Sequence, residues 1–295
     1  MVNYVCSQCG RKHDPGELIF RCECGGLLDI EKFDFSFSRK DILSNEWSIF
    51  RYLKALPFDG SSEVWKQVTM GEGLTPIKAL EEGDPDTLLK VDYLMPTLSF
   101  KDRGAVIVIA IAKELGVKRV IQDSSGNAGN SIAAYASRAG ITCDIYVPEH
   151  TSPKKINQIA SYGATVHVIK GTREDTAREA LKAAEKGDAF YASHVYNPFF
   201  YQGTKTYAYE IYEQLDGNVP DNIVIPVGNG TLLLGSYYGF KELFGLGLIF
   251  KMPRIVAVQA EGCAPIYEAF KADKPTVESV VNKGTLAEGI AIAEP

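Results

Sequence analysis

The chain has 295 residues, a formal net charge of −6, 45% hydrophobic residues and 23% charged residues. This composition is typical of a globular protein with room for about two domains. The negative charge argues against general nucleic-acid binding, and the longest apolar run, residues 105–112, is too short to span a bilayer. The first residues show no leader with a charged and then an apolar part, so we expect a cytoplasmic protein without membrane or nucleic-acid partners.

The first 31 residues predict a small separate module. Two cysteine pairs, Cys6/Cys9 and Cys22/Cys24, stand about a dozen residues apart, each followed by glycine. Four thiolates at this spacing can close a tetrahedral zinc site, although Cys-x-Cys is the less usual second pair and His13 is an alternative ligand. Disulfides are the other interpretation, but the absence of a leader argues against an oxidising compartment. The module offers no open coordination position or base, so we predict a structural role.

Lys101 is the first candidate for chemistry. It stands in the stretch Ser-Phe-Lys-Asp-Arg-Gly, residues 99–104, directly before the apolar run. Apolar residues on every side predict a buried helix, which Gly116 should end. A lysine at the start of a helix and beside apolar residues has a lowered pKa, and a neutral amine attacks carbonyl groups. The alternative is an ordinary surface lysine.

Alternating strand and helix signals follow from residue 119 onward and predict parallel sheets covered by helices. Before them, residues 88–92 predict a strand. The expected strands cover residues 119–123, 143–147, 165–169, 222–227 and 255–259. One helix is expected between the loop that follows residue 123 and Gly140, and another from Pro153 to about Gly163. Further helices are expected after a Thr172–Asp175 capping box, over residues 206–215, and from Leu232 onward. Residues 35–70 predict helical or irregular structure without identifiable chemistry.

Two polar loops join a predicted strand to a predicted helix, which is where open α/β sheets bind ligands. The first is Ser-Ser-Gly-Asn-Ala-Gly-Asn-Ser, residues 124–131, whose hydroxyl, amide and backbone N–H groups suit a carboxylate or a phosphate. The second is Gly-Asn-Gly-Thr, residues 228–231, where glycines let backbone amides approach an anion closely. A dinucleotide fingerprint would need a glycine at Leu233, so a phosphate site of another kind fits better. An activated lysine with two anion loops suits an aldehyde cofactor that carries a phosphate.

These three stretches resemble the signature segments of fold-type II pyridoxal-phosphate enzymes. Residues 71–76, Gly-Glu-Gly-Leu-Thr-Pro, and the cysteine-bearing start are similar to archaeal-type threonine synthases. The resemblance covers nearly the whole chain. It implies an α/β fold with two parallel-sheet αβα domains, a large one from 35–105 and 205–295 and a small one from 106–204, beside the zinc-ribbon-like module of 1–31. It also implies a homodimer that acts on a small amino acid.

The resemblance further implies roles for individual residues. Lys101 would attach pyridoxal 5′-phosphate covalently and later carry protons, and Asn127 would bond the ring hydroxyl of the cofactor. The cofactor phosphate would be held by Gly228, Asn229, Gly230 and Thr231. The substrate carboxylate would face Ser124, Ser125, Ala128 and Gly129, with Thr75 as a further candidate. Structural zinc would be held by Cys6, Cys9, Cys22 and Cys24.

One segment departs from the resemblance. Threonine synthases commonly place asparagine, serine and arginine where this chain has His194, Val195 and Phe200. In the family these residues help to bind the phosphate of O-phosphohomoserine, and phenylalanine supplies no charged hydrogen bond. We therefore expect poor use of that substrate unless His194 and Lys205 compensate in part, and we expect Phe200→Arg to improve it.

Several functions remain open at this point. The first is threonine synthase-like elimination and water addition by a pyridoxal-phosphate lyase. The second is a serine/threonine dehydratase, or a replacement synthase that uses an O-activated serine. A nicotinamide-dependent oxidoreductase lacks its glycine fingerprint, and a non-catalytic zinc protein would leave Lys101 unmodified.

Overall fold

The computed structural model describes residues 2–58, 62–81 and 86–295 of the chain. It divides into two compact units, Met1–Gly203 and Thr204–Pro295, which we call unit 1 and unit 2. Both contain parallel strands followed by helices, which confirms the predicted α/β class. Within the described ranges, every helix falls short of the length and apolarity that a bilayer crossing requires.

Unit 1 is built on a four-stranded parallel sheet with the order β8-β7-β6-β9. The strands are β6 (Arg119–Gln122), β7 (Thr142–Pro148), β8 (Thr165–Ile169) and β9 (Phe190–Tyr191), and the crossover helices are α2 (Asn127–Ala139), α3 (Pro153–Ser161) and α4 (Arg173–Ala184). All of these except β9 were predicted to within a few residues. Gly140, at φ +69°, ends α2, and the Thr172–Asp175 capping box starts α4 as expected.

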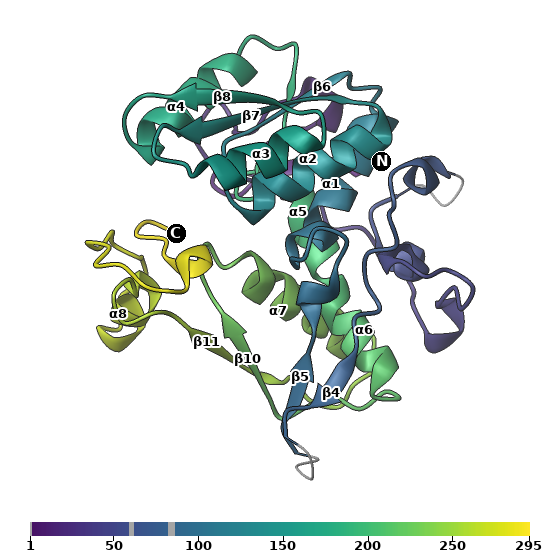
Figure 1. Cartoon of the computed structure of the whole chain (residues 1–295). Coiled ribbons are helices and arrows are strands. Elements are labelled where there is room, and N and C mark those ends of the chain that lie inside the picture. The colour runs from purple at the N-terminus through teal and green to yellow at the C-terminus, as the bar shows by residue number, and fades with distance from the viewer. Residues whose placement is uncertain (1, 59–61, 82–85) are drawn as a thin grey trace. The chain divides into compact units, whose positions relative to one another are not determined.

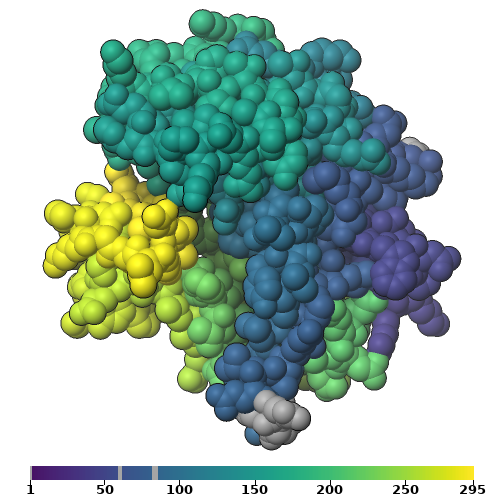
Figure 2. Space-filling view, in the orientation of Figure 1, coloured from purple at the N-terminus to yellow at the C-terminus, as the bar shows by residue number. Residues whose placement is uncertain are grey.

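The two faces of this sheet carry different helices (Figure 1). Val120 and Ile145 pack in one apolar cluster with α1 (Lys101–Glu114), α2 and α3, whereas Ile121 and Tyr146 pack with α4. Alternate residues of a strand point to opposite faces, so the apolar runs in these strands fill both layers. In the space-filling view the teal residues of this layered body form one continuous surface (Figure 2).

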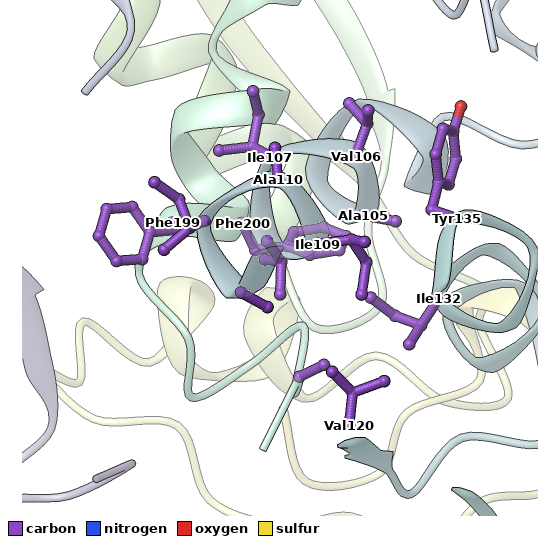
Figure 3. Packing of buried hydrophobic residues seen from close by; sticks show 14 of the residues in the cluster. Ala105, Val106, Ile107, Ile109, Ala110, Val120, Ile132, Tyr135, Phe199 and Phe200 are labelled. Carbon is purple, nitrogen blue, oxygen red and sulfur yellow. The ribbon is translucent and has the colours of Figure 1, made fainter. Parts of the chain in front are cut away.

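Helix α1 lies at the centre of the core of unit 1. Its residues from Asp102 to Ala112 are all buried, as the apolar run predicted. Figure 3 shows Ile132 and Tyr135 of α2 and Phe199 and Phe200 of α5 (Phe199–Thr204) around the side chains of α1. The approach to α5 is very close, because a Cβ on Gly203 would lie 1.9 Å from the carbonyl oxygen of Arg103.

The N-terminal module folds as a small antiparallel sheet, β2-β1-β3, from Tyr4–Cys6, Lys12–His13 and Leu28–Ile30. Aromatic contacts join it to β9 and to the segment that follows β9. The ring centroids of Tyr4 and Phe199 are 5.5 Å apart, and those of Phe20 and Tyr191 are 5.4 Å apart. Arg21 donates a hydrogen bond of 2.6 Å to the Tyr196 hydroxyl and also stacks over that ring.

In sequence, the rest of unit 1 lies between the module and α1. Short 3₁₀ helices cover Arg39–Asp41, Ile49–Ala55 and Val64–Gln67, in line with the irregular structure expected there. Strand β5 (Leu88–Lys90) was expected, and it pairs antiparallel with β4 (Ile77–Ala79), which was not.

Unit 2 contains one parallel strand pair, β10 (Asn222–Pro226) with β11 (Arg254–Val258). Helices α6 (Thr206–Gln214) and α7 (Thr231–Gly245) pack against each other, and α8 (Pro265–Lys271) follows β11. The strands, α6 and α7 match the expected positions, and α8 was missed.

Candidate functional site

Lys101 is the first residue of α1, and its backbone N–H donates to the Ser99 hydroxyl oxygen at 3.2 Å. The side chain is half-buried, with Nζ 4.7 Å from the ring centroid of Phe100 and 5.6 Å from that of Phe200. Burial, and then the positive charge of Arg173, lower the pKa of the Lys101 amine to about 7. A large fraction of this amine is therefore neutral and nucleophilic near neutral pH.

The two residues after Lys101 fix the start of the helix. The buried Asp102 carboxylate accepts hydrogen bonds from the Thr97 N–H at 2.7 Å, the Thr97 hydroxyl at 2.5 Å and the Ser131 hydroxyl at 2.5 Å. Arg103, with no exposed surface, donates two bonds of 2.9 Å to Asp92. Because Ser131 belongs to α2, the starts of α1 and α2 are held side by side.

The loop of residues 124–129 connects β6 to α2. A Cβ on Gly129 would lie 1.8 Å from the Ser124 carbonyl oxygen, so only glycine lets the loop fold back this tightly. Ser124 and Ser125 are half-buried, Ala128 is buried, and Asn127 is exposed as the first residue of α2. The loop therefore presents its amides and an asparagine side chain at a helix N-terminus, where a carboxylate or phosphate is favoured.

Thr75 has internal partners in the structure. Its hydroxyl donates to Asp92 at 2.7 Å and accepts a bond of 2.7 Å from the amine of Lys90. The neighbouring Glu72 is fully buried and accepts bonds from Tyr135, Thr69 and the Met70 amide at 3.0, 2.9 and 3.0 Å. Burial raises the pKa of Glu72 to about 7. Sequence reasoning missed this buried acid, because a glutamate between two glycines reads as an exposed turn.

In unit 2 the glycine loop connects β10 to α7. Gly230 has φ +77° and open space where a Cβ would stand, whereas a Cβ on Gly228 would lie 3.0 Å from Ile292. Asn229 lies between them, and the buried Thr231 begins α7. A left-handed residue before a helix N-terminus turns successive amides towards one point, which is the geometry of a phosphate cradle.

Lys205 is buried in unit 2 and forms an ion pair there. Its Nζ donates to Glu242 at 2.9 Å, and the other oxygen of Glu242 accepts a bond of 2.8 Å from the Tyr209 hydroxyl. A buried lysine with a carboxylate partner is held by that partner. The geometry therefore offers no support for Lys205 as a substrate ligand.

Phe200 is a core residue. Its ring has no exposed surface and packs on Gly104, whose added Cβ would lie only 2.4 Å from two ring atoms. The ring also faces Lys101, and the ring of the buried His194 lies 6.0 Å from it. An arginine at position 200 would place a second cation in this core beside Lys101. The structure therefore argues against the expected gain from Phe200→Arg.

The four cysteines of the module form one cluster. Their Sγ atoms all lie within 4.8 Å of one another, with 3.4 Å between Cys6 and Cys24 and 3.6 Å between Cys9 and Cys22. A zinc tetrahedron with bonds of about 2.3 Å has sulfur–sulfur edges of about 3.8 Å, whereas a disulfide bond measures about 2.05 Å. His13 lies outside the cluster and contacts the Cys22 sulfur at 3.4 Å. The geometry fits four thiolate ligands.

Comparison with known proteins identifies relatives over nearly the full length. The sequence profile described as pyridoxal-phosphate dependent enzyme matches residues 68–295. A threonine synthase of Methanocaldococcus jannaschii is 36% identical over 98% of this chain and 73% of its own length. One of Methanosarcina acetivorans is 34% identical over 100% of this chain and 74% of its own length.

Solved structures agree on the fold. The processed form of threonine deaminase isoform 2 from Solanum lycopersicum superposes with a TM-score of 0.65 at 24% identity, over 88% of this chain and 71% of that one. A serine racemase from Dictyostelium discoideum superposes with a TM-score of 0.60 at 28% identity, over 70% of this chain and 64% of that one. The chain thus belongs to the pyridoxal-phosphate dependent enzyme family and is a homologue of the threonine synthases.

Proposed function

We propose that this chain catalyses a threonine synthase-like reaction, in which O-phosphohomoserine is converted to threonine by elimination of phosphate and addition of water. The observation that carries the proposal is the Lys101 amine at the start of α1, half-buried between two aromatic rings, with a pKa of about 7. The archaeal threonine synthase relatives support the specific reaction.

The residues present fit pyridoxal 5′-phosphate. Lys101 offers a neutral amine for the aldehyde, and the glycine loop of 228–231 offers a cradle in which Gly230 leaves open space. Asn127 is exposed at the start of α2, where its amide is available for the ring hydroxyl. We assign the phosphate to Gly228, Asn229, Gly230 and Thr231.

When bound, this cofactor stabilises negative charge on the substrate carbon next to the amino group. The chain itself supplies the other parts of the reaction. The Lys101 amine removes and returns protons at that carbon, since its pKa lies near the working pH. The amides of residues 124–129 orient the substrate carboxylate. Phe100 and Phe200 cover Lys101 and reduce its contact with water.

The cofactor and the lysine can be tested together. Purified protein should show a visible absorption band that borohydride abolishes, and mass spectrometry should then find the reduced cofactor on Lys101. Lys101→Ala should remain folded and lose both band and turnover. A reduced cofactor on a different lysine, or turnover by Lys101→Ala, would show the assignment to be wrong.

Deamination of serine or threonine is the second candidate. It is favoured by the buried, uncharged Phe200, which stands where the resemblance expects an arginine for the substrate phosphate. A side-by-side assay of O-phosphohomoserine, O-phosphoserine, threonine and serine separates the two. Threonine and phosphate as the main products support the synthase, whereas keto acid and ammonia support the dehydratase.

We also propose a structural zinc ion held by Cys6, Cys9, Cys22 and Cys24. The compact cluster supports it, and the amide N–H of Cys9, 3.5 Å from the Cys6 sulfur, helps to lower the pKa of that thiol to about 6, which favours the thiolate that zinc requires. A cytoplasmic homodimer, and the division into a large domain (35–105 with 205–295) and a small one (106–204), are further parts of the proposal. They rest on the resemblance, and gel filtration with light scattering tests the dimer.

A further inference from the structure

Three polar residues stand one helical turn apart along α2. Asn127, Ser131 and Tyr135 follow a four-residue spacing, which places them in one row along the helix surface. Ser131 and Tyr135 have no exposed surface, whereas Asn127, the first residue of the helix, is exposed. Because a helix moves as a rigid element, any contact that fixes Ser131 also fixes the place of Asn127.

Both buried residues of this row donate to a buried carboxylate. The Ser131 hydroxyl donates to Asp102 of α1 at 2.5 Å, and the Tyr135 hydroxyl donates to Glu72 at 3.0 Å. Neither carboxylate has any exposed surface. Hydrogen bonds to a charged group are strong and depend on geometry, so these two bonds set the position of α2 on its neighbours.

The remaining contacts between α1 and α2 are mostly apolar. Ala105 and Ile109 of α1 and Ile132 of α2 pack in the same buried cluster (Figure 3). Apolar contacts of this kind stabilise the pair of helices without preferring one register, because the hydrophobic effect has no direction. A buried carboxylate adds little net stability compared with an apolar pair of similar volume. The bond from Ser131 to Asp102 therefore contributes direction, which the apolar contacts lack.

This bond lies next to both residues that we assign to the cofactor ring. Asp102 directly follows Lys101 on α1, and Ser131 lies one turn, about 6 Å along the axis, after Asn127 on α2. The aldehyde and the ring hydroxyl of pyridoxal 5′-phosphate are on neighbouring ring carbons. The Lys101 amine and the Asn127 amide can therefore reach the same ring only if their spacing is fixed.

We propose that Ser131 and Asp102 are positioning residues, whose hydrogen bond sets the spacing between Lys101 and Asn127 so that one cofactor meets both. The inference rests on the proposed function and deepens it, since it concerns the same cofactor site. Ser131 and Asp102 act through the two helices, and neither is assigned a contact with the cofactor.

A second hydrogen bond between the two helices provides a matched control. The Lys113 amine donates to the carbonyl oxygen of Ala139 at 2.6 Å, at the opposite ends of α1 and α2. Lys113→Met removes this donor and keeps the aliphatic stem. Ser131→Ala removes the hydroxyl and leaves Asp102 its two bonds from Thr97. Both variants lose one bond between the helices, so both should lower the midpoint of urea unfolding.

A double-mutant cycle with Asn127→Ala tests the positioning. The probe is pyridoxal 5′-phosphate, titrated into the full chain after removal of its cofactor and followed by visible absorption. Asn127→Ala should weaken binding about tenfold in the wild-type and Lys113→Met backgrounds. In the Ser131→Ala background the same change should cost less than about threefold, because the amide there no longer reaches the ring hydroxyl. Ser131→Cys, with a weaker donor of similar size, should lie in between.

Two results would overturn the inference. An equal loss from Asn127→Ala in all three backgrounds would show that Ser131 supports the fold alone. An Asn127→Ala protein that binds the cofactor as tightly as wild type would show that the spacing to Asn127 does not matter.

The binding cycle needs no turnover, so it can be separated from the proposed function. If Ser131 and Asn127 are coupled in cofactor binding but O-phosphohomoserine yields no threonine, the proposed reaction is refuted and the positioning stands. If threonine forms and the two residues are not coupled, the positioning is refuted and the proposed reaction stands.

Discussion

Replacing Gly104 with alanine would push a methyl group into the ring of Phe200. The added Cβ would lie 2.4, 2.4 and 2.5 Å from three ring carbons, whereas carbon atoms in contact need about 3.5 Å. The ring would have to move by about 1 Å, and it has no exposed surface. Overpacking of this kind costs about 1–3 kcal/mol, against about 1 kcal/mol gained from alanine in a helix. The difference is a net loss of up to about 2 kcal/mol.

Urea unfolding followed by circular dichroism measures this loss as a lower midpoint. The control is Gly245→Ala, at the end of α7, where an added Cβ meets nothing within 4 Å. Its midpoint should stay the same or rise. Adding Phe200→Leu to Gly104→Ala should recover part of the loss, because the smaller side chain relieves the clash. A Gly104→Ala protein as stable as wild type, without coupling to position 200, would refute the reasoning.

Three further outcomes are expected. Acylation of Lys101 should accelerate as pH rises through about 7, because only the neutral amine reacts and its pKa is lowered from the usual 10.5; a rise only near pH 10 would contradict this. Elemental analysis of purified reduced protein should find about one zinc per chain. Cys9→Ser should lose the zinc, whereas Cys143→Ala, outside the cluster, should keep it. A metal-free wild-type protein would contradict the zinc proposal. Phe200→Arg should lower the unfolding midpoint without improving turnover of O-phosphohomoserine, because it buries a cation beside Lys101. A variant that is as stable as wild type and turns over O-phosphohomoserine faster would instead support the expectation from the sequence that an arginine improves use of this substrate.

The helices and strands of the parallel sheets were predictable because their signals are local. The apolar run of 105–112, the glycine at position 140 and the capping box at Thr172 each specify structure within a few residues. The cysteine pairs likewise predicted a compact cluster from spacing alone. Short elements such as β4 and β9 were missed, because a strand of two or three residues owes its existence to its partner strand.

The surroundings of Lys101 were predictable only in part. Burial of the lysine beside apolar residues follows from its neighbours in sequence, and it is the main cause of the lowered pKa. The charge of Arg173 acts from 72 positions along the chain and depends on which strand ends share an edge. Phe200 stands in the sequence where the family commonly has a phosphate-binding arginine, yet its contact with Gly104 depends on the close approach of α5 to α1.

The aromatic contacts of the N-terminal module connect the proposed zinc site to residues beyond its own sheet. Tyr4, Phe20 and Arg21 press on Phe199, Tyr191 and Tyr196, and the same stretch of chain carries His194 and Phe200. Chelation of the proposed zinc ion should therefore loosen residues 190–200, and hydrogen exchange should become faster there than in β7. In an enzyme built in this way, loss of the metal would raise KM before the chain unfolded. The supply of metal would then determine the reaction rate at low substrate concentration.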